Sequence, residues 1–286
     1  MAVSRHGSGV RADIRAYASQ VHPVFMLPPV AASLFGAVLT TDFELVPAAV
    51  HAVAIFAAVY TAHVKDGYVD YHVRGEDDDH PLTVAGCRFG LVGATTLFAG
   101  ATLVLAVDVT LLAAVLTLPT WVIAYLHAPQ LDVHPIGATM GYPAGIGVAI
   151  LGGYASQTGA VSTLAMAFAF VFVLVLTGIK IVDDTTDVAY DRTIRKRTVA
   201  VVLGPDRAVA LAYAVISVGL AICLAFALVG LFPPGSVAAV LSLALVAIAA
   251  HRAPPKLATM LLIRGSYVFL AVLVAAVWFE PLASVL

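Results

Sequence analysis

The chain has 286 residues, of which 61% are hydrophobic and only 11% are charged. A soluble domain of this size does not need so much apolar surface, so the composition excludes an ordinary soluble enzyme and indicates a polytopic membrane protein. The formal net charge of −2 does not identify a partner, because the charged residues are segregated along the chain. Cys87 and Cys223 fall in apolar segments, so we expect two buried thiols rather than a disulfide.

The apolar runs predict an all-α bundle of about nine transmembrane helices in a single domain over residues 1–286. Residues 1–20 form a polar tail without the apolar core of a cleaved signal peptide, so we expect the first span to anchor the chain. A spanning helix needs about 20 apolar residues. The predicted spans lie near residues 22–40, 46–65, 86–107, 109–127, 135–156, 160–182, 205–230, 235–250 and 257–279.

Basic residues are confined to alternate connections between these spans. All fifteen lysines and arginines lie in the N-terminal tail or in segments 65–88, 180–207 and 251–264. Nine spans place these segments on one side, which the positive-inside rule makes cytoplasmic. We therefore expect a multi-pass protein of the cell membrane with its N-terminus inside and its C-terminus outside.

Three aspartates follow the sixth predicted span at regular spacing. Asp183, Asp187 and Asp191 stand at i, i+4 and i+8. On one continuous helix they would share a face, where the carboxylates repel one another unless a cation lies among them. Hard cations such as Mg²⁺ prefer oxygen ligands of this kind. The spacing therefore predicts a magnesium site, although a solvated charged loop is the simpler alternative.

Basic residues flank these aspartates on both sides. Arg192, Lys196 and Arg197 follow them, and Lys180 precedes them by one helical turn. Guanidinium and ammonium groups form charge-assisted hydrogen bonds with phosphate oxygens. Contact with lipid headgroups explains such a cluster nearly as well, and Lys180 could simply extend to the membrane interface.

A second acidic stretch closes the second predicted span. Asp66 and Asp70 stand at i and i+4, and Arg74 occupies the third position. The two stretches are four spans apart, so both face the cytoplasm. Their carboxylates could hold one or two Mg²⁺ ions bridged by a diphosphate. Arg74 would then be a phosphate donor, whereas residues 76–79 form either part of the site or a solvated acidic loop.

Such a site suits the loss of diphosphate from a lipophilic ester. Metal ions and cationic side chains neutralise the charge that develops on the leaving diphosphate. A cavity within the bilayer accommodates a long hydrocarbon tail, and it keeps water away from the allylic carbocation that remains. The residues therefore predict transfer of an allylic hydrocarbon group to a lipophilic acceptor.

These segments resemble those of the UbiA-type integral-membrane prenyltransferases. Residues 183–191 resemble the DxxxDxxxD segment of that family, and residues 191–204 resemble the D-R-x-x-G-(R/K)-K-T-x-x-V-V-L-G run that follows it. Residues 66–75 are similar to the N-D-x-x-D segment, and residues 125–131 to the Y-S-A-P-P-L segment. The resemblance covers the chain from about residue 20, and nine helices with the N-terminus inside is also the family's architecture.

The resemblance implies Mg²⁺-dependent transfer of a polyprenyl group from an allylic polyprenyl diphosphate to an aromatic or quinone precursor, an ether lipid or a carotenoid. It implies that the catalytic metal ligands are Asp66, Asp70, Asp183 and Asp187, with Asp191 as a further ligand. The implied diphosphate-binding residues are Arg74, Tyr125, Lys180, Arg192, Lys196 and Arg197. The expected partners are these two substrates and membrane lipid, with no nucleic acid and no obligate protein partner.

Some residues depart from the family's pattern. Asp66 replaces an asparagine, and Gly67 replaces the aspartate that follows it. Arg195 stands where glycine is usual, and Tyr190 where a small residue is common. A basic residue is expected shortly after the segment that begins at Tyr125, but the sequence there is Asp-Val-His, so a protonated His134 would have to supply the charge.

Two other functions remain open from the sequence. A CDP-alcohol phosphotransferase also uses spaced aspartates, and Asp66-Gly67 begins such a motif, but its alanine-arginine pair is missing and the second aspartate run lies far downstream. A transporter would place ionisable residues in broken helices near the middle of the membrane. Pro143 and nearby glycines could break a helix, yet nearly all charges lie at span ends. Diphosphate release with and without EDTA would separate the enzymes from a transporter.

Overall fold

The computed structural model describes residues 2–280, and these are almost entirely helical apart from one isolated bridge between Ser4 and Leu82. The apolar helices are α2 (Pro23–Ala37), α3 (Leu45–Gly67), α4 (Val84–Val104), α5 (Leu111–Leu126), α6 (Pro135–Thr158), α7 (Thr163–Thr186), α10 (Pro205–Leu228), α11 (Ser236–His251) and α12 (Pro255–Phe279). The other elements are α1 (Val10–Ala18), α8 (Val188–Thr193), α9 (Val199–Leu203) and the π-helical turns η1 (Tyr68–Arg74), η2 (Leu105–Val109) and η3 (His127–Leu131).

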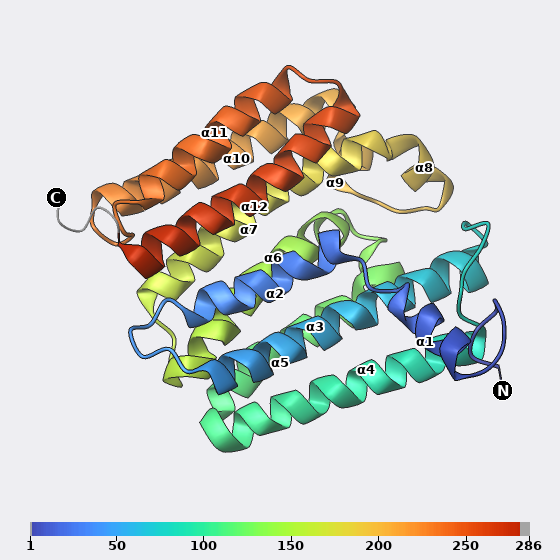
Figure 1. Ribbon diagram of the computed structural model, residues 1–286. Coiled ribbons are helices and arrows are strands. Elements are labelled where there is room, and N and C mark those ends of the chain that lie inside the picture. Colours follow the sequence, from blue (N-terminus) through green and yellow to red (C-terminus); the bar gives the residue numbers. More distant parts are fainter. Residues whose placement is uncertain (1, 281–286) are drawn as a thin grey trace.

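Within residues 2–280, seven helical segments are long and apolar enough to cross a membrane. Helices α2 and α11 are apolar but have only 15 and 16 residues, fewer than the roughly 20 that a straight span needs. The chain is therefore a multi-pass helical membrane protein, whereas a count of nine spans stays a prediction. Figure 1 shows α2 to α6 in one half of the bundle and α7, α10, α11 and α12 in the other.

The two halves are joined along α7. This helix packs against α6 on one side and α10 on the other. The Phe168 ring of α7 stacks on Phe232 at a centroid distance of 3.7 Å and meets Phe35 of α2 edge-on at 5.0 Å. Because α7 is the most deeply buried spanning segment, its last turns have a fixed position relative to both halves.

The second span is longer than the sequence predicts. Helix α3 continues into η1 and ends only at Arg74, where Gly75 adopts a left-handed conformation with φ 66°. Glycine has no Cβ to oppose that conformation, so it terminates the helix at little cost. The predicted boundary near residue 65 is therefore too early, and Asp66 and Asp70 lie on the last turns of a helix.

The sixth span ends differently from the prediction. Helix α7 stops at Thr186, and Asp187 has a non-helical φ of −113° and precedes the separate helix α8. The Thr186 hydroxyl donates to the Asp183 carbonyl, and the Asp187 N–H bonds to the Asp184 carbonyl in a tightened last turn. The prediction that Asp183, Asp187 and Asp191 share one face of one helix is therefore wrong.

Glycines bring α2 and α6 into close contact. A Cβ added to Gly36 would overlap the carbonyl oxygen of Ile150, and one added to Gly153 would overlap that of Ser33. Neither obstacle is the flexible end of a side chain, so a larger residue would force the two helices apart.

We expect Gly153→Ala to lower the free energy of unfolding by about 1–3 kcal/mol, because it overpacks this backbone contact. Thermal unfolding of the detergent-purified protein measures the loss as a lower Tm. Gly100→Ala is the matched control, since a Cβ at Gly100 of α4 meets nothing within 4 Å. Equal Tm values for the two variants would contradict the contact.

Candidate functional site

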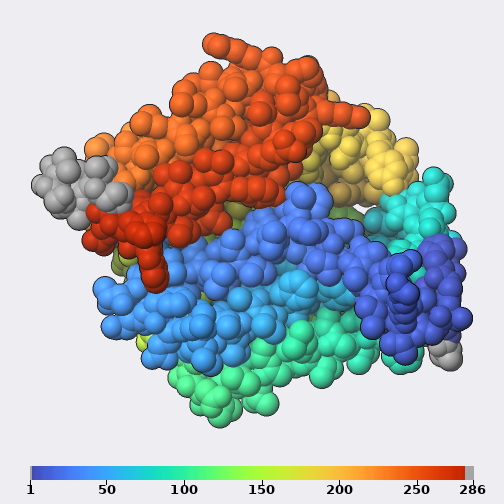
Figure 2. Space-filling view, in the orientation of Figure 1, coloured from blue at the N-terminus to red at the C-terminus, as the bar shows by residue number. Residues whose placement is uncertain are grey.

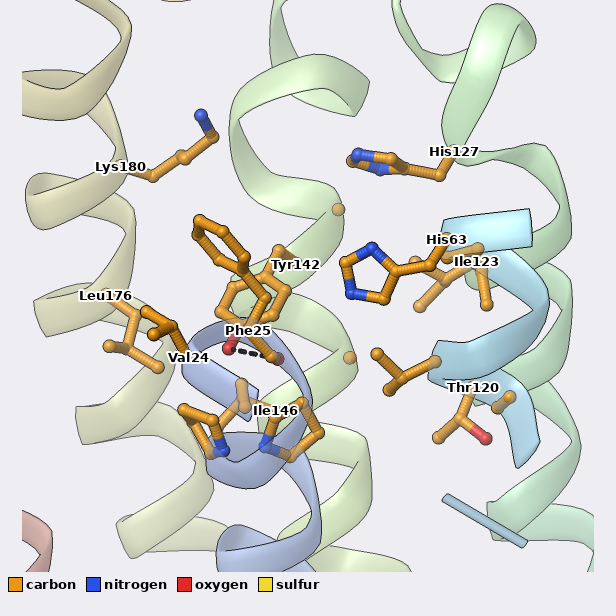
Figure 3. Close-up of a pocket in the computed structure, with 18 of the residues that line it drawn as sticks. Val24, Phe25, His63, Thr120, Ile123, His127, Tyr142, Ile146, Leu176 and Lys180 are labelled. Carbon is orange, nitrogen blue, oxygen red and sulfur yellow. Dashed lines mark hydrogen bonds between the residues drawn. The ribbon is translucent and has the colours of Figure 1, made fainter. Parts of the chain in front are cut away.

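A cavity of about 330 Å³ lies among α2, α3, α5, α6, α7 and α12. Most of its lining is apolar, and Figure 3 shows Val24, Ile146 and Thr120 toward one end, with Lys180 and His127 at the other. The charged and histidine side chains of the lining gather where both acidic stretches begin, and they are His63, Asp66, His127, Lys180 and Asp183. The cavity therefore combines a charged end with an apolar chamber.

Asp66 carries the first acidic stretch into this cavity. Its Oδ1 atom is buried and has no hydrogen-bond partner among the described residues. Two histidines line the same region: His127 at the start of η3, and His63, whose Nδ1 lies 3.4 Å from Nδ1 of His22. A buried carboxylate oxygen without a partner is unfavourable, and a bound cation would satisfy it.

Asp183 and Lys180 carry the second stretch into the cavity from the last turns of α7. The Lys180 ammonium donates to Asp183 Oδ2 at 2.8 Å and to Asp184 Oδ1 at 2.6 Å. The Asp183 side chain keeps 30% of its surface exposed, whereas that of Asp184 keeps only 2%. Asp183 is thus available to a ligand, and Asp184 is a buried partner that holds Lys180.

Asp184 is a site residue that the aspartate spacing did not reveal. Its Oδ2 accepts a hydrogen bond of 3.0 Å from Thr139 of α6, and the Thr139 hydroxyl oxygen in turn accepts from the Val199 N–H at 3.1 Å. This chain of bonds links α6, α7 and the start of α9. Asp184, the neighbour of the predicted ligand Asp183, is therefore the residue that holds these three segments together.

Asp191 lies in α8, and its carboxyl is also buried. Its Oδ1 is 3.8 Å from the Lys196 ammonium, and its Oδ2 has no partner among the described residues. Burial raises the pKa of Asp191, while the Lys196 charge opposes that shift. The positive charge of Lys196 also attracts the carboxylates of Asp66 and Asp184. Lys196 therefore lies among carboxylates from both acidic stretches.

Arg74, at the end of η1, forms ion pairs with three carboxylates. Its guanidinium lies 3.1 Å from Asp132 Oδ2, 3.5 Å from Glu76 Oε1 and 3.6 Å from Asp70 Oδ1. Asp132 follows η3, and its carbonyl oxygen accepts the Arg197 N–H at 2.7 Å. Arg74 therefore connects the first acidic stretch to the η3 segment and, through it, to the segment after α8.

Glu76 connects Arg74 to the second acidic stretch as well. The Tyr190 hydroxyl of α8 donates to Glu76 Oε2 at 2.8 Å. Loss of solvation and this hydrogen bond raise the pKa of Tyr190 to about 12, so the phenol stays protonated and remains a donor. Figure 2 shows the loop after η1 and the α8 region together at the end of the bundle near the N-terminus. We refer to Arg74, Glu76, Asp132 and Tyr190 as the bridging cluster.

Tyr125 lies beside Lys65 and is not among the residues that line the cavity. The Lys65 ammonium lies 4.0 Å from the centre of the Tyr125 ring, donates to the Tyr125 carbonyl, and donates to Gln130 Oε1 at 2.9 Å. These contacts fix the start of η3, which presents His127 to the cavity. Tyr125 and Lys65 thus position the start of η3, a role that the sequence did not predict.

Three of the predicted site residues have exposed side chains outside the cavity lining. Asp187 is exposed at the junction of α7 and α8, and Arg192 and Arg197 are exposed beyond it. Asp70 also lies outside the cavity lining and pairs with Arg74. The structure therefore brings Asp66, Asp183 and Lys180 together in the cavity, with Asp191 and Lys196 nearby.

The donor set at the charged end fits Mg²⁺. The candidate ligands are carboxylate oxygens, the hard donors that this cation prefers. Two of these oxygens, Oδ1 of Asp66 and Oδ2 of Asp191, are buried without a partner in the described part of the chain. The ammonium groups of Lys180 and Lys196 lie beside these carboxylates and could donate to an anionic ligand such as a diphosphate once bound cations offset the carboxylate charge.

The fold is that of the UbiA-type membrane prenyltransferases, as solved structures show over nearly the whole chain. No protein-family model and no curated protein matches the sequence. The described helices thus agree with a fold that neither the family models nor the curated proteins detect.

Particular structures align closely despite low sequence identity. A structure of a digeranylgeranylglyceryl phosphate synthase in membranes aligns with a TM-score of 0.75 at 12% identity, covering 93% of this chain and 99% of that one. A UbiA homologue from Aeropyrum pernix K1 aligns with a TM-score of 0.67 at 15% identity, covering 93% and 100%. A UbiA homologue from Archaeoglobus fulgidus, bound to GPP and Mg²⁺, aligns with a TM-score of 0.67 at 15% identity, covering 94% and 99%.

We expect Asp184→Asn to lower the free energy of unfolding by roughly 3 kcal/mol, because it breaks a buried ion pair. Asp183→Asn should cost less than about 1 kcal/mol, since that carboxylate is partly exposed. Thermal unfolding in detergent distinguishes the two variants. A larger loss for Asp183→Asn would contradict the assignment of Asp184 as the residue that holds Lys180.

Arg195 stands where the resembling family has glycine, and its φ of 60° lies in the left-handed region. A Cβ is disfavoured there, so we expect Arg195→Gly to stabilise the protein by about 1 kcal/mol. Arg192→Gly, within helix α8, is the control and should cost about 1 kcal/mol. Destabilisation by Arg195→Gly would show that the Arg195 side chain contributes more than its backbone strain costs.

Proposed function

We propose that this chain is a Mg²⁺-dependent prenyltransferase, which transfers a polyprenyl group from an allylic polyprenyl diphosphate to a lipophilic acceptor within the membrane. One observation carries the proposal: Asp66 and Asp183, from the ends of α3 and α7, line the charged end of a single cavity whose other end is apolar. This arrangement accommodates both parts of a diphosphate ester with a hydrocarbon tail.

The proposed metal ligands are Asp66, Asp183 and Asp191, with Asp70 and Asp187 completing the two acidic stretches. Bound Mg²⁺ would neutralise the negative charge that develops on the leaving diphosphate. Asp70 is held by Arg74, and Asp187 is exposed, so these two carboxylates would have to reorient to join the metal site.

Cationic side chains would bind the oxygens of the diphosphate. Lys180 lines the cavity and Lys196 lies among the carboxylates, so both are placed to donate. Arg74 is proposed as a further donor at the edge of the site, where the bridging cluster holds its guanidinium. Arg192 and Arg197 are exposed and would contact a diphosphate only if the segment after α8 folded toward the cavity.

The apolar chamber would hold the prenyl chain and exclude water from the reacting carbon. Residues such as Phe25, Ile55 and Leu176 offer no group that could attack a carbocation. Mass balance requires the bond between the allylic carbon and the diphosphate oxygen to break, and a bond from that carbon to the acceptor to form. The acceptor loses a proton and diphosphate is released.

The structural neighbours support this proposal. UbiA homologues from Archaeoglobus fulgidus were solved with GPP and Mg²⁺ and with DMAPP and Mg²⁺. We extend the same ligand class to this chain because its cavity combines the required charge and apolarity. The charged end is proposed to open toward the cytoplasm, since the basic residues gather on that side.

The described helices give a transporter less support. Pro143 and the nearby glycines do not interrupt α6, which is one helix from Pro135 to Thr158. A transporter would be expected to use a broken helix at that depth. The charged residues of the cavity also come from helix ends rather than from its middle.

We expect Asp66→Asn and Asp183→Asn each to reduce prenyl transfer by about 100-fold or more, because each removes charge that stabilises the leaving group. Release of labelled diphosphate from an allylic prenyl diphosphate, in nanodiscs with and without EDTA, measures the effect. Asp206→Asn is the matched control, because Asp206 is exposed at the start of α10. Full activity in Asp183→Asn, or in EDTA, would overturn the proposed function.

We expect Arg74→Ala to raise KM for the prenyl diphosphate by about tenfold, because the variant loses one charge-assisted hydrogen bond to the substrate. Asp132→Asn should produce part of this effect, because Asp132 holds the guanidinium. Steady-state kinetics with varied diphosphate substrate give KM and kcat separately. An unchanged KM in Arg74→Ala would limit Arg74 to a structural role.

A further inference from the structure

Two histidines and a cysteine converge at a place that the proposed reaction does not use. His72 belongs to η1, His80 to the following loop and Cys87 to the first turn of α4. Each offers one ligand atom, and the three atoms lie within 4.8 Å of one another. His80 and Cys87 are buried, and His72 is partly buried. Nitrogen and sulfur donors so close together form a set unlike the oxygen set of the cavity.

A second observation points to a missing ligand. The His80 side chain is 97% removed from solvent, since the residue is only 3% exposed, yet its Nε2 has no partner among the described residues. Its other nitrogen, Nδ1, can accept from the Leu82 N–H at 3.2 Å or donate to the Leu82 carbonyl oxygen at 3.4 Å, and the second tautomer leaves Nε2 unprotonated, as a metal ligand must be. Whichever tautomer is present, Nε2 is left as a buried polar atom without a partner, which is unfavourable.

The backbone around the cluster suits metal-binding imidazoles. His72 Nε2 lies 3.0 Å from the Leu82 carbonyl oxygen, so that carbonyl can accept from His72 and leave Nδ1 of this ring free. A backbone carbonyl that accepts from one ring nitrogen fixes the tautomer in which the other nitrogen binds a metal. At Gly67, a Cβ would overlap the His80 ring, so this glycine provides the space for it.

We propose that His72, His80 and Cys87 form a binding site for Zn²⁺ or a similar thiophilic divalent cation. Zinc binds imidazole nitrogen and thiolate sulfur at about 2.0–2.3 Å, which places tetrahedral ligands about 3.5 Å apart. The three donors would approach by roughly 1 Å, and water would occupy the fourth position. Binding releases the thiol proton of Cys87 to solvent, and no electron is transferred.

Such an ion would fasten the segment that follows the first acidic stretch. It would connect η1, the loop of residues 75–83 and the start of α4. The N-terminal segment already covers this loop: the Arg5 guanidinium donates to the His80 carbonyl at 2.9 Å and lies 3.2 Å from Asp79. The proposed role is therefore structural, and it does not depend on the prenyl-transfer chemistry.

The test uses Co²⁺ as a spectroscopic probe with the full chain in nanodiscs. Metal is first removed with a chelator, and Co²⁺ is then titrated in the presence of excess Mg²⁺, which occupies oxygen sites. We expect one equivalent to bind with a thiolate-to-cobalt charge-transfer band, and equimolar Zn²⁺ to displace it. Cys87→Ser should abolish the band. Cys223→Ser is the matched control, because Cys223 is a free, buried cysteine of α10.

Two further variants keep the test decisive if Cys87→Ser fails to fold. His72→Gln and His80→Gln should each weaken Co²⁺ binding by at least tenfold while leaving Cys87 present. Zn²⁺ should also protect Cys87, but not Cys223, from alkylation in the unaltered protein. Absence of the band from the folded protein, or its persistence in Cys87→Ser, would overturn the proposal. Neither outcome bears on diphosphate release, so the proposed function is tested separately.

Discussion

Buried carboxylate oxygens that lack a partner among the described residues constrain the charged end of the cavity and its surroundings. Asp66 reaches the cavity from α3 and Asp183 from α7, while Oδ1 of Asp66 and Oδ2 of Asp191 remain unpaired among the described residues. Burial of such oxygens is unfavourable unless a cation joins them. The described protein groups do not satisfy these two oxygens, whereas the metal ion that we propose would. The long, buried helix α7 supplies the rigidity that keeps these groups in place.

Two departures from the family's pattern, at Asp132 and Tyr190, are connected to each other through Arg74 and Glu76. A basic residue is expected in the segment where Asp132 stands, and Tyr190 replaces a small residue. In the structure Arg74 pairs with Asp132 and Glu76, and Tyr190 donates to Glu76. These contacts join segments that precede α4, follow η3 and follow α7. Asp132 and Tyr190 therefore belong to one set of connected contacts, the bridging cluster, in which Arg74 supplies positive charge that the η3 segment lacks.

Hydropathy and motif spacing predicted the helical membrane fold and the two acidic stretches, because apolar length and charge position are local properties of the sequence. The helix ends were not predictable in the same way. Thr186 and Asp187 end α7 through local hydrogen bonds, which separates Asp191 from Asp183. The roles of Asp184 and Lys65 depend on Thr139, Tyr125 and Gln130, which are distant in sequence. The positive φ of Arg195 could have been predicted, because glycine is usual at this position in the family that the chain resembles.

We propose that carboxylates from both acidic stretches bind one metal-diphosphate unit. Anomalous diffraction from crystals grown with Mn²⁺ and a non-hydrolysable allylic prenyl diphosphate analogue tests this arrangement. Mn²⁺ accepts the same oxygen ligands as Mg²⁺, and its anomalous scattering reveals its position. We expect an anomalous peak at bonding distance from Asp66 or Asp70 and from Asp183, Asp187 or Asp191, with the prenyl chain in the apolar chamber. A peak confined to the loop of residues 76–79, or an analogue bound outside the cavity, would contradict it.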